Sequence, residues 1–318
     1  VVVLLFLFQT FFGIVTAHYI VENGFYGFDI RSIFPYSITR SWHLQLSIFW
    51  IATAWLAAGM FMAPMLSRHE PKGQHWLVKA LFVAILIVAV GSIAGEWLGI
   101  KNMLGNLWFW FGHQGWEYLE LGRFWQALLT VGMVLWAFIV YRSISPLLKG
   151  KDHGSLPYML LYGVMAIPLF FSFGMMYHPG TNFAVADFWR WWVVHLWVEG
   201  FFEVFAAAVM ALIFVKLGLV NAKSATTAVL FATIVFMSGG VLGTLHHLYF
   251  TGTPTFVIAL GAMFSALEVV PLAMVGVEAY RNYQRSKAAP WVQAYKWPIL
   301  CFIAVGFWNV VGAGLLGF

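Results

Sequence analysis

Charged residues and cysteine are both scarce in this chain of 318 residues: charged side chains make up 9% of it, and cysteine occurs once. A soluble domain of this size carries far more charge on its surface, so the composition excludes a soluble protein. The single Cys301 excludes an internal disulfide and a thiolate cluster, which leaves histidine and carboxylate as ligands for any metal. The formal charge of +5 does not indicate nucleic-acid binding, because the basic residues are spread over short loops.

Hydrophobic residues make up 62% of the chain, and the mean hydropathy is +0.84. Runs of about 20 apolar residues each predict a membrane-spanning helix. No internal repeat or linker is visible, so residues 1–318 are expected to form one all-α transmembrane catalytic domain. Both ends lie inside hydrophobic runs, so the sequence is expected to be a piece of a longer protein. Nine spans are predicted, at about residues 1–22, 41–66, 76–99, 124–142, 156–177, 188–216, 224–250, 254–280 and 297–318.

The basic residues predict the orientation of these spans. Twelve of the 17 Lys and Arg residues lie in loops that follow even-numbered spans. By the positive-inside rule these loops are cytoplasmic. The sixth span therefore runs inward, the seventh runs outward and the eighth runs inward.

The sixth span carries a polar stripe, made of His195, Glu199 and Glu203 at a spacing of four residues. Residues four apart lie on one face of a helix, and ionisable groups within a bilayer usually face the protein interior and mark chemistry. At 1.5 Å per residue, His195 lies about 10 Å from the outer surface and Glu199 about 16 Å. His246 and His247 lie about 5–6 Å from the same surface, near the end of the seventh span.

Three imidazoles and one carboxylate at similar depth predict a metal site that suits iron, copper or zinc. Neighbouring residues on a helix point about 100° apart, so His246 and His247 can share an ion only if the helix is locally distorted. Three glycines just before them would permit such a distortion: Gly239, Gly240 and Gly243. The alternative is that the histidines bond to helix carbonyls or form a proton relay.

Glu203 and Glu268 are both expected near 20 Å depth, where they would meet. Two close buried carboxyls cannot both ionise easily, which predicts proton carriers that serve a reduction site. Pro271 is expected to interrupt the helix just after Glu268. The alternative is a pair of protonated acids with a structural role.

Three further groups of polar residues lie near the predicted outer surface. His43, at the expected start of the second span, is either a haem ligand or an ordinary interfacial histidine. His18 and Glu22 would either bind a quinol headgroup or form an interfacial pair. Glu117 and Glu120 would either hold a hard cation such as calcium or lie in a solvated loop.

Three stretches resemble bacterial nitric oxide reductase, a family of the haem–copper oxidase superfamily. They are WWVVHLWVEG at Trp191–Gly200, GTLHH at Gly243–His247 and FSALE at Phe264–Glu268. The segment Trp116–Trp125 and the His18–Glu22 pair look most like the single-subunit, quinol-dependent branch. Oxygen-reducing relatives of the common type have Pro and a cross-linked Tyr where this chain has Leu196 and Glu199.

The resemblance implies a role for each of these residues. The non-haem iron would be held by His195, His246, His247 and Glu199; the low-spin haem b by His43; calcium by one or both of Glu117 and Glu120; and quinol by His18 and Glu22. Glu203 and Glu268 would support the iron and deliver protons. In this family the remaining ligands of the low-spin haem and the high-spin haem b lie on a later helix, and this chain stops before that helix.

The function that the resemblance implies is reduction of two NO to nitrous oxide and water with electrons from quinol. The expected location is the bacterial cytoplasmic membrane, with the site in its outer half. The expected partners are quinol, nitric oxide and the lipid bilayer, without nucleic acid, and assembly as a homodimer is left open. The alternatives are an oxygen-reducing oxidase and a metal or proton transporter.

Overall fold

The computed structural model describes residues 1–21, 27–116, 119–150 and 154–315. Within these ranges the regular elements are helices, apart from one isolated bridge between His113 and Leu121. Eight helical stretches of the described chain are long and apolar enough to cross a membrane. They are Val2–Val21, Tyr36–Ser67, Gln74–Ile100, Arg123–Leu148, Leu156–Met176, Phe183–Lys216, Ala222–His247 and Thr255–Ser286. The expected all-α, polytopic fold is therefore confirmed.

The chain divides into two compact units. The first unit is Val1–Ser143 with Gly174–Met176, and the second is Ile144–Phe173 with Tyr177–Phe318. Helix α5 (Arg123–Leu148) begins in the first unit and ends in the second.

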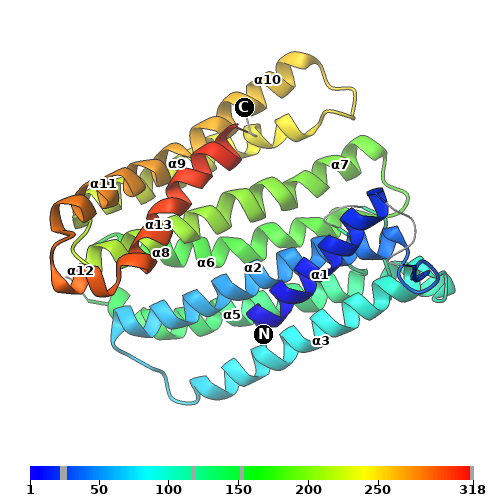
Figure 1. Ribbon diagram of the computed structural model, residues 1–318, viewed down its shortest axis with the longest axis horizontal. Helices are drawn as coiled ribbons and strands as arrows, with labels where there is room; N and C mark the ends of the chain where they lie inside the picture. The colour runs from blue at the N-terminus through cyan, green and yellow to red at the C-terminus, as the bar shows by residue number, and fades with distance from the viewer. Residues whose placement is uncertain (22–26, 117–118, 151–153, 316–318) are drawn as a thin grey trace. The chain divides into compact units, whose positions relative to one another are not determined.

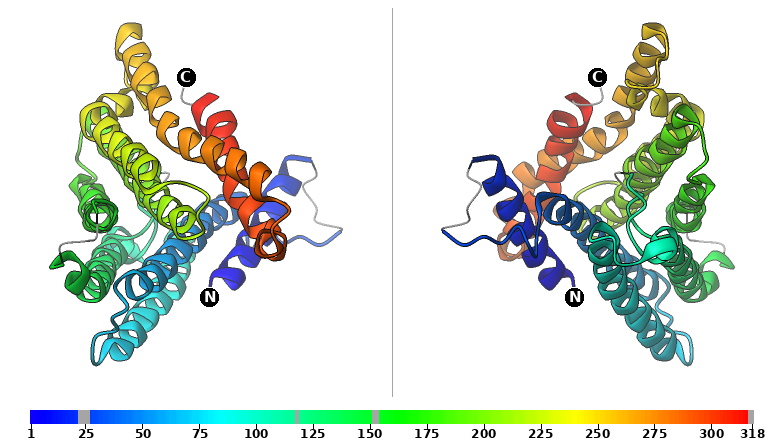
Figure 2. Two further views of the ribbon diagram at one scale, coloured as in Figure 1. Left: turned by 90° about the vertical axis from the view of Figure 1, so that its left-hand side faces the viewer. Right: turned by 90° about the vertical axis from the view of Figure 1, so that its right-hand side faces the viewer.

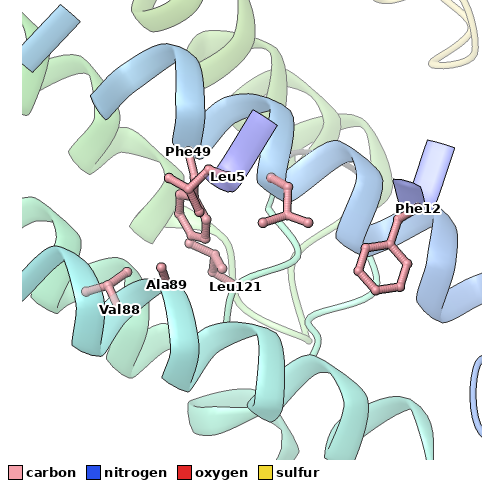
Figure 3. Close-up of a cluster of buried hydrophobic side chains, with 7 residues drawn as sticks. Leu5, Phe12, Phe49, Val88, Ala89 and Leu121 are labelled. Carbon is pink, nitrogen blue, oxygen red and sulfur yellow. The ribbon is translucent and has the colours of Figure 1, made fainter. Parts of the chain in front are cut away.

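The first unit contains α1 (Val2–Val21), α2 (Tyr36–Ser67) and α3 (Gln74–Ile100), with the short η1 (Gly105–Leu107) and α4 (Trp108–Phe111). Figure 3 shows part of its core, in which side chains of α1, α2 and α3 pack with Leu121 from the segment before α5. The Trp42 indole N–H donates to the Ile93 carbonyl at 3.1 Å and ties α2 to α3. Small residues let membrane helices approach closely, and Gly95 of α3 lies directly against the Phe111 carbonyl.

The second unit is built around the continuous stretch of α7 (Phe183–Trp191), η3 (Trp192–Phe201) and α8 (Phe202–Lys216). Helices α6 (Leu156–Ser172) and α9 (Ala222–Gly243) pack against this stretch. Helix α9 also lies beside α10 (Thr255–Glu268) and α11 (Val270–Ser286), which follow each other as one bent rod (Figures 1 and 2). The rod breaks at Val269, and Pro271 lies in the first turn of α11, as predicted for a residue that lacks a backbone N–H.

The predicted boundaries differ from the structure by five or six residues at several ends, because the fourth span ends at Leu148, the sixth begins at Phe183 and the eighth ends at Ser286. Helix α2 begins at Tyr36 and not near residue 41, because the chain enters the helix directly after the extended Pro35. The ninth predicted span is a shorter apolar stretch, Lys296–Gly312, formed by α13 (Lys296–Trp308) and η5 (Asn309–Gly314) after the short α12 (Pro290–Ala294). The remaining short helix is η2 (Phe173–Met176), which extends α6.

Candidate metal centre

The sixth predicted span contains a π-helix at its centre and is not one regular α-helix. Its α7 segment starts at Asn182, whose side-chain oxygen accepts a hydrogen bond from the Ala184 N–H at 3.0 Å. Phe170 of α6 stacks on Phe201 with ring centroids 4.5 Å apart, and on Trp192 at 6.1 Å. These are the last and first residues of the π-helical η3. A π-helix is rare in proteins, and here one aromatic side chain of a neighbouring span contacts both of its ends.

His195 and Glu199 both lie in η3 and face each other. The Nδ1 atom of His195 is 2.9 Å from Oε2 of Glu199. The same carboxylate oxygen is 3.3 Å from Nε2 of His247, which is itself 3.3 Å from Nδ1 of His195. His195 and Glu199 therefore share one face of the helix, as expected for residues four apart, and His247 from the next span lies beside them.

His246 and His247 reach the same place because the helix tightens. Helix α9 ends at Gly243, and Thr244–His247 form the 3₁₀-helix η4. The two imidazole centroids lie 4.0 Å apart, and both rings lie within 5.3 Å of the His195 ring. The predicted distortion is present.

The glycines of α9 act differently from the prediction, because Gly243 keeps ordinary right-handed helical angles. Their role is to leave space. A Cβ atom at Gly243 would meet Nε2 of His195 at 2.5 Å and Oε1 of Glu268 at 3.3 Å. A Cβ atom at Gly240 would meet Leu196 at 3.1 Å. The absence of side chains therefore lets His195 and Glu268 lie against α9.

This cluster fits a metal ion. Ligand atoms of His195, Glu199, His246 and His247 all lie within 4.8 Å of one another. His195 is completely buried, and its Nδ1 atom faces Oε2 of Glu199 and Nε2 of His247. Three imidazoles and a carboxylate offer four donors of the type that iron, copper and zinc accept.

Glu268 lies at the edge of the cluster, at the end of α10. Its Oε1 atom is 3.5 Å from Nε2 of His195, and only 4% of the residue is exposed. Glu203 lies on α8, where its carboxyl interacts with the Asn309 side chain and with the charge of Glu268. Sequence reasoning missed Asn309, because nothing in the apolar run around it indicates which way its amide points.

His43 lies in the first unit, about two turns inside α2 and not at its start. Its Nδ1 atom is 2.9 Å from the Gln9 carbonyl of α1, and Nε2 of Gln9 is 3.1 Å from the same atom. A Cβ atom at Gly13 would meet the imidazole at 2.6 Å, so α1 passes directly over the ring. These Gln9 contacts fix the orientation of the imidazole, and an axial haem ligand would bind through Nε2, which lies 3.5 Å from Nε2 of Gln9.

Two of the predicted outer residues, Glu22 and Glu117, lie outside the described residues. His18 is half-buried on α1. Glu120 is almost completely buried, and its Oε2 atom accepts a hydrogen bond from Nε2 of Gln45 at 2.7 Å. The solvated-loop alternative is therefore wrong for Glu120.

Sequence reasoning also missed two buried groups near Glu120. Glu96 of α3 is completely buried, and neither of its carboxylate oxygens has a hydrogen-bond partner among the described residues. A lone acid within an apolar span is the signal that would have found it. His113 lies between the Ser41 hydroxyl, 2.8 Å from Nε2, and the Gly115 N–H, 2.8 Å from Nδ1. Burial, helped by the charge of Arg40, lowers the pKa of His113 to about 4.

Comparison with known proteins shows which family the chain belongs to. A nitric oxide reductase polypeptide of Stutzerimonas stutzeri is 27% identical to this chain over 316 residues, which cover 96% of the chain and 64% of that relative. The chain therefore spans less than two thirds of the relative's length. A family model described as cytochrome c and quinol oxidase polypeptide I matches residues 1–318. Because that match covers all 318 residues, the chain belongs to the cytochrome c and quinol oxidase polypeptide I family.

Proposed function

We propose that this chain forms the catalytic part of a membrane nitric oxide reductase, which converts two NO, two electrons and two protons into nitrous oxide and water. The observation that carries the proposal is Glu199, whose carboxylate lies within 2.9 and 3.3 Å of two site histidines. A carboxylate at this place adds a hard oxygen donor, which favours iron over copper. The likeness to a nitric oxide reductase polypeptide supports the same assignment.

The metal would be held by His195, His246, His247 and Glu199. A non-haem iron bound there would supply Lewis-acidic and redox chemistry for NO, together with a high-spin haem b as the second cofactor. The Oε2 atom of Glu199, which faces both His195 and His247, would be the oxygen donor to the metal. The buried walls around His195 would exclude bulk water from the reacting molecules.

Protons would be held on the two deeper carboxyls. Glu268 is the nearer one, with Oε1 3.5 Å from His195, and Glu203 follows on α8 beside Asn309. Two acids in succession provide a short route by which a proton reaches the site as an electron arrives.

Electrons would come from quinol through a low-spin haem b on His43. The hydrogen bond between Nδ1 of His43 and Gln9 supports this ligand role. An apolar cavity of about 820 Å³ lies in the same unit and is lined by α1, α2 and α3, including Phe12, Trp42 and Trp97. It would suit the hydrophobic tail of a quinol whose headgroup binds His18 and Glu22. Glu120, with Glu117, would hold calcium.

We further propose that the protein lies in the bacterial cytoplasmic membrane, with the site in the outer half. The loop charges and the eight apolar helices support this orientation. A homodimer is compatible with the proposal and is not required by it.

The full-length protein should be purified in detergent and tested for haem absorbance, iron content and turnover. We expect NO consumption with a quinol donor, and loss of non-haem iron in Glu199→Ala and His246→Ala. Glu70→Gln is the matched control, because Glu70 is an exposed acid outside the site. An unchanged iron content in both site variants would refute the metal centre. Oxygen turnover without NO consumption would indicate an oxidase, and absence of haem would favour a transporter.

A further inference from the structure

Trp191, the last residue of α7, lies flat against a site histidine. The ring centroids of Trp191 and His247 are 4.2 Å apart, and the planes differ by only 10°. The other ring contacts of His247 within the site are steep, at 59° to His246 and 66° to His195. Parallel stacking of this kind adds a directional contact beyond simple burial.

The side chain of His247 is less restricted by its surroundings than the side chain of His195. Its side chain is 16% exposed, whereas the His195 side chain is completely buried. It also ends the four-residue η4, after which the backbone leaves helical angles at Leu248. Both short contacts of its ring, to Glu199 and His195, involve the single Nε2 atom. Contacts at a single atom do not fix the rotation of the imidazole ring. A stacked aromatic ring therefore contributes more to the orientation of His247 than it would to that of His195.

Trp191 is itself supported by a buried ion pair on the same helix. Nη2 of Arg190 is 2.8 Å from Oδ1 of Asp187, with side chains that are 15% and 2% exposed. The Arg190 guanidinium carbon lies 4.6 Å from the Trp191 ring centroid, in cation–π contact. The Asp187 carboxylate also interacts with the Trp191 indole N–H. The indole is therefore held through both its ring and its nitrogen.

We propose that Trp191 is a positioning residue, which keeps the His247 imidazole turned toward the metal and is held in place by the Asp187–Arg190 pair. This inference rests on the proposed metal centre. Residues that orient a metal ligand from outside commonly change metal affinity by about 10- to 100-fold when they are removed. We expect the lower end of that range, about tenfold, because Glu199 still contacts His247 after the stack is lost.

The test is Fe²⁺ binding to the full-length protein in detergent, measured as non-haem iron per polypeptide against a series of chelator-buffered Fe²⁺ concentrations. Trp191→Leu should weaken binding about tenfold, and Trp191→Phe, which keeps a flat ring, should restore it to within about threefold of the wild type. Trp189→Leu is the matched control on the same helix, because Trp189 stacks on Phe173 and its ring contacts among the described residues do not include a site histidine. Thermal unfolding of each variant reports folding separately.

The outcomes separate this inference from the proposed function. If the wild type binds no Fe²⁺, the metal centre itself is wrong, and this inference falls with it. If the wild type binds Fe²⁺ and Trp191→Leu binds it equally well, or Trp189→Leu loses as much affinity, only the role of Trp191 is overturned. Equal losses in Trp191→Phe and Trp191→Leu would also overturn it. If Trp191→Leu does not fold, Fe²⁺ binding to Asp187→Asn decides the question. Weaker binding supports the positioning role of Trp191, and unchanged binding overturns it.

Discussion

Replacing Gly243 with alanine should strongly weaken metal binding while leaving the fold intact. The new Cβ atom would lie 2.5 Å from Nε2 and 3.1 Å from Cε1 of His195, whereas ordinary contacts begin at 3.4 Å. The imidazole must therefore retreat by about 1 Å, but metal–ligand distances tolerate only about 0.2 Å. Retreat is blocked, because His195 is completely buried and Glu199 lies 2.9 Å from its other nitrogen. We expect Fe²⁺ affinity to fall by about 100-fold.

The effect on stability should be modest. Alanine is favoured over glycine within helices by about 1 kcal/mol, while overpacking a filled site costs about 1–3 kcal/mol. The assay is iron content together with thermal unfolding in detergent. Gly312→Ala is the control, because no atom of the described chain lies within 4 Å of a Cβ atom built there. A folded Gly243→Ala protein with a full complement of non-haem iron would refute the steric argument.

Three further predictions concern the first unit. Because the pKa of His113 is lowered to about 4 by burial and by Arg40, the folded state binds fewer protons than the unfolded state between about pH 6.5 and 4. The free energy of unfolding should therefore fall by about 1–2 kcal/mol from pH 7 to pH 5, and it should fall less in His113→Gln. If the two proteins differ in free energy of unfolding by the same amount at both pH values, this prediction is wrong. Gly13→Ala places a Cβ atom 2.6 Å from the His43 ring and should reduce the low-spin haem signal in the absorbance spectrum, so an unchanged spectrum would argue against His43 as ligand. Gln74→Leu removes hydrogen bonds of 2.8 and 2.9 Å from a buried amide and should lower the free energy of unfolding by about 1–3 kcal/mol, which equal thermal melts would disprove.

The four residues of the candidate metal centre could be predicted from the sequence, because the prediction needed only the spacing within one helix and the depth of two helix ends. Spacing of four residues brings His195 to Glu199 on almost any helical geometry, including the π-helix found here. Hydrophobic runs and loop charges then brought His246 and His247 to the same depth. The rotation of the helix about its axis did not have to be predicted, because two adjacent histidines point in directions about 100° apart and one of them faces the site over a wide range of rotations.

Features that depend on packing between distant segments could not be predicted in this way. The π-helix lies against Phe170, a residue of a different span that contacts both of its ends. The role of Gly243 follows from the close approach of His195, and no local pattern reveals that approach. Asn309 could be found only once the rotation of α13 and η5 relative to α8 was known. These are tertiary effects, which override the local signals on which sequence reading depends.

The charges of the metal centre explain why its acids and its metal belong together. Glu199 and Glu268 lie beside His195 at 2.9 and 3.5 Å, and the nearby Arg190 is already paired with Asp187. If both glutamates are ionised, the cluster carries two negative charges, which are costly to bury within a membrane. A divalent cation held by the neutral imidazoles cancels them. Under the proposed function, Glu268 would balance part of the charge of the bound metal and would hold a proton beside it.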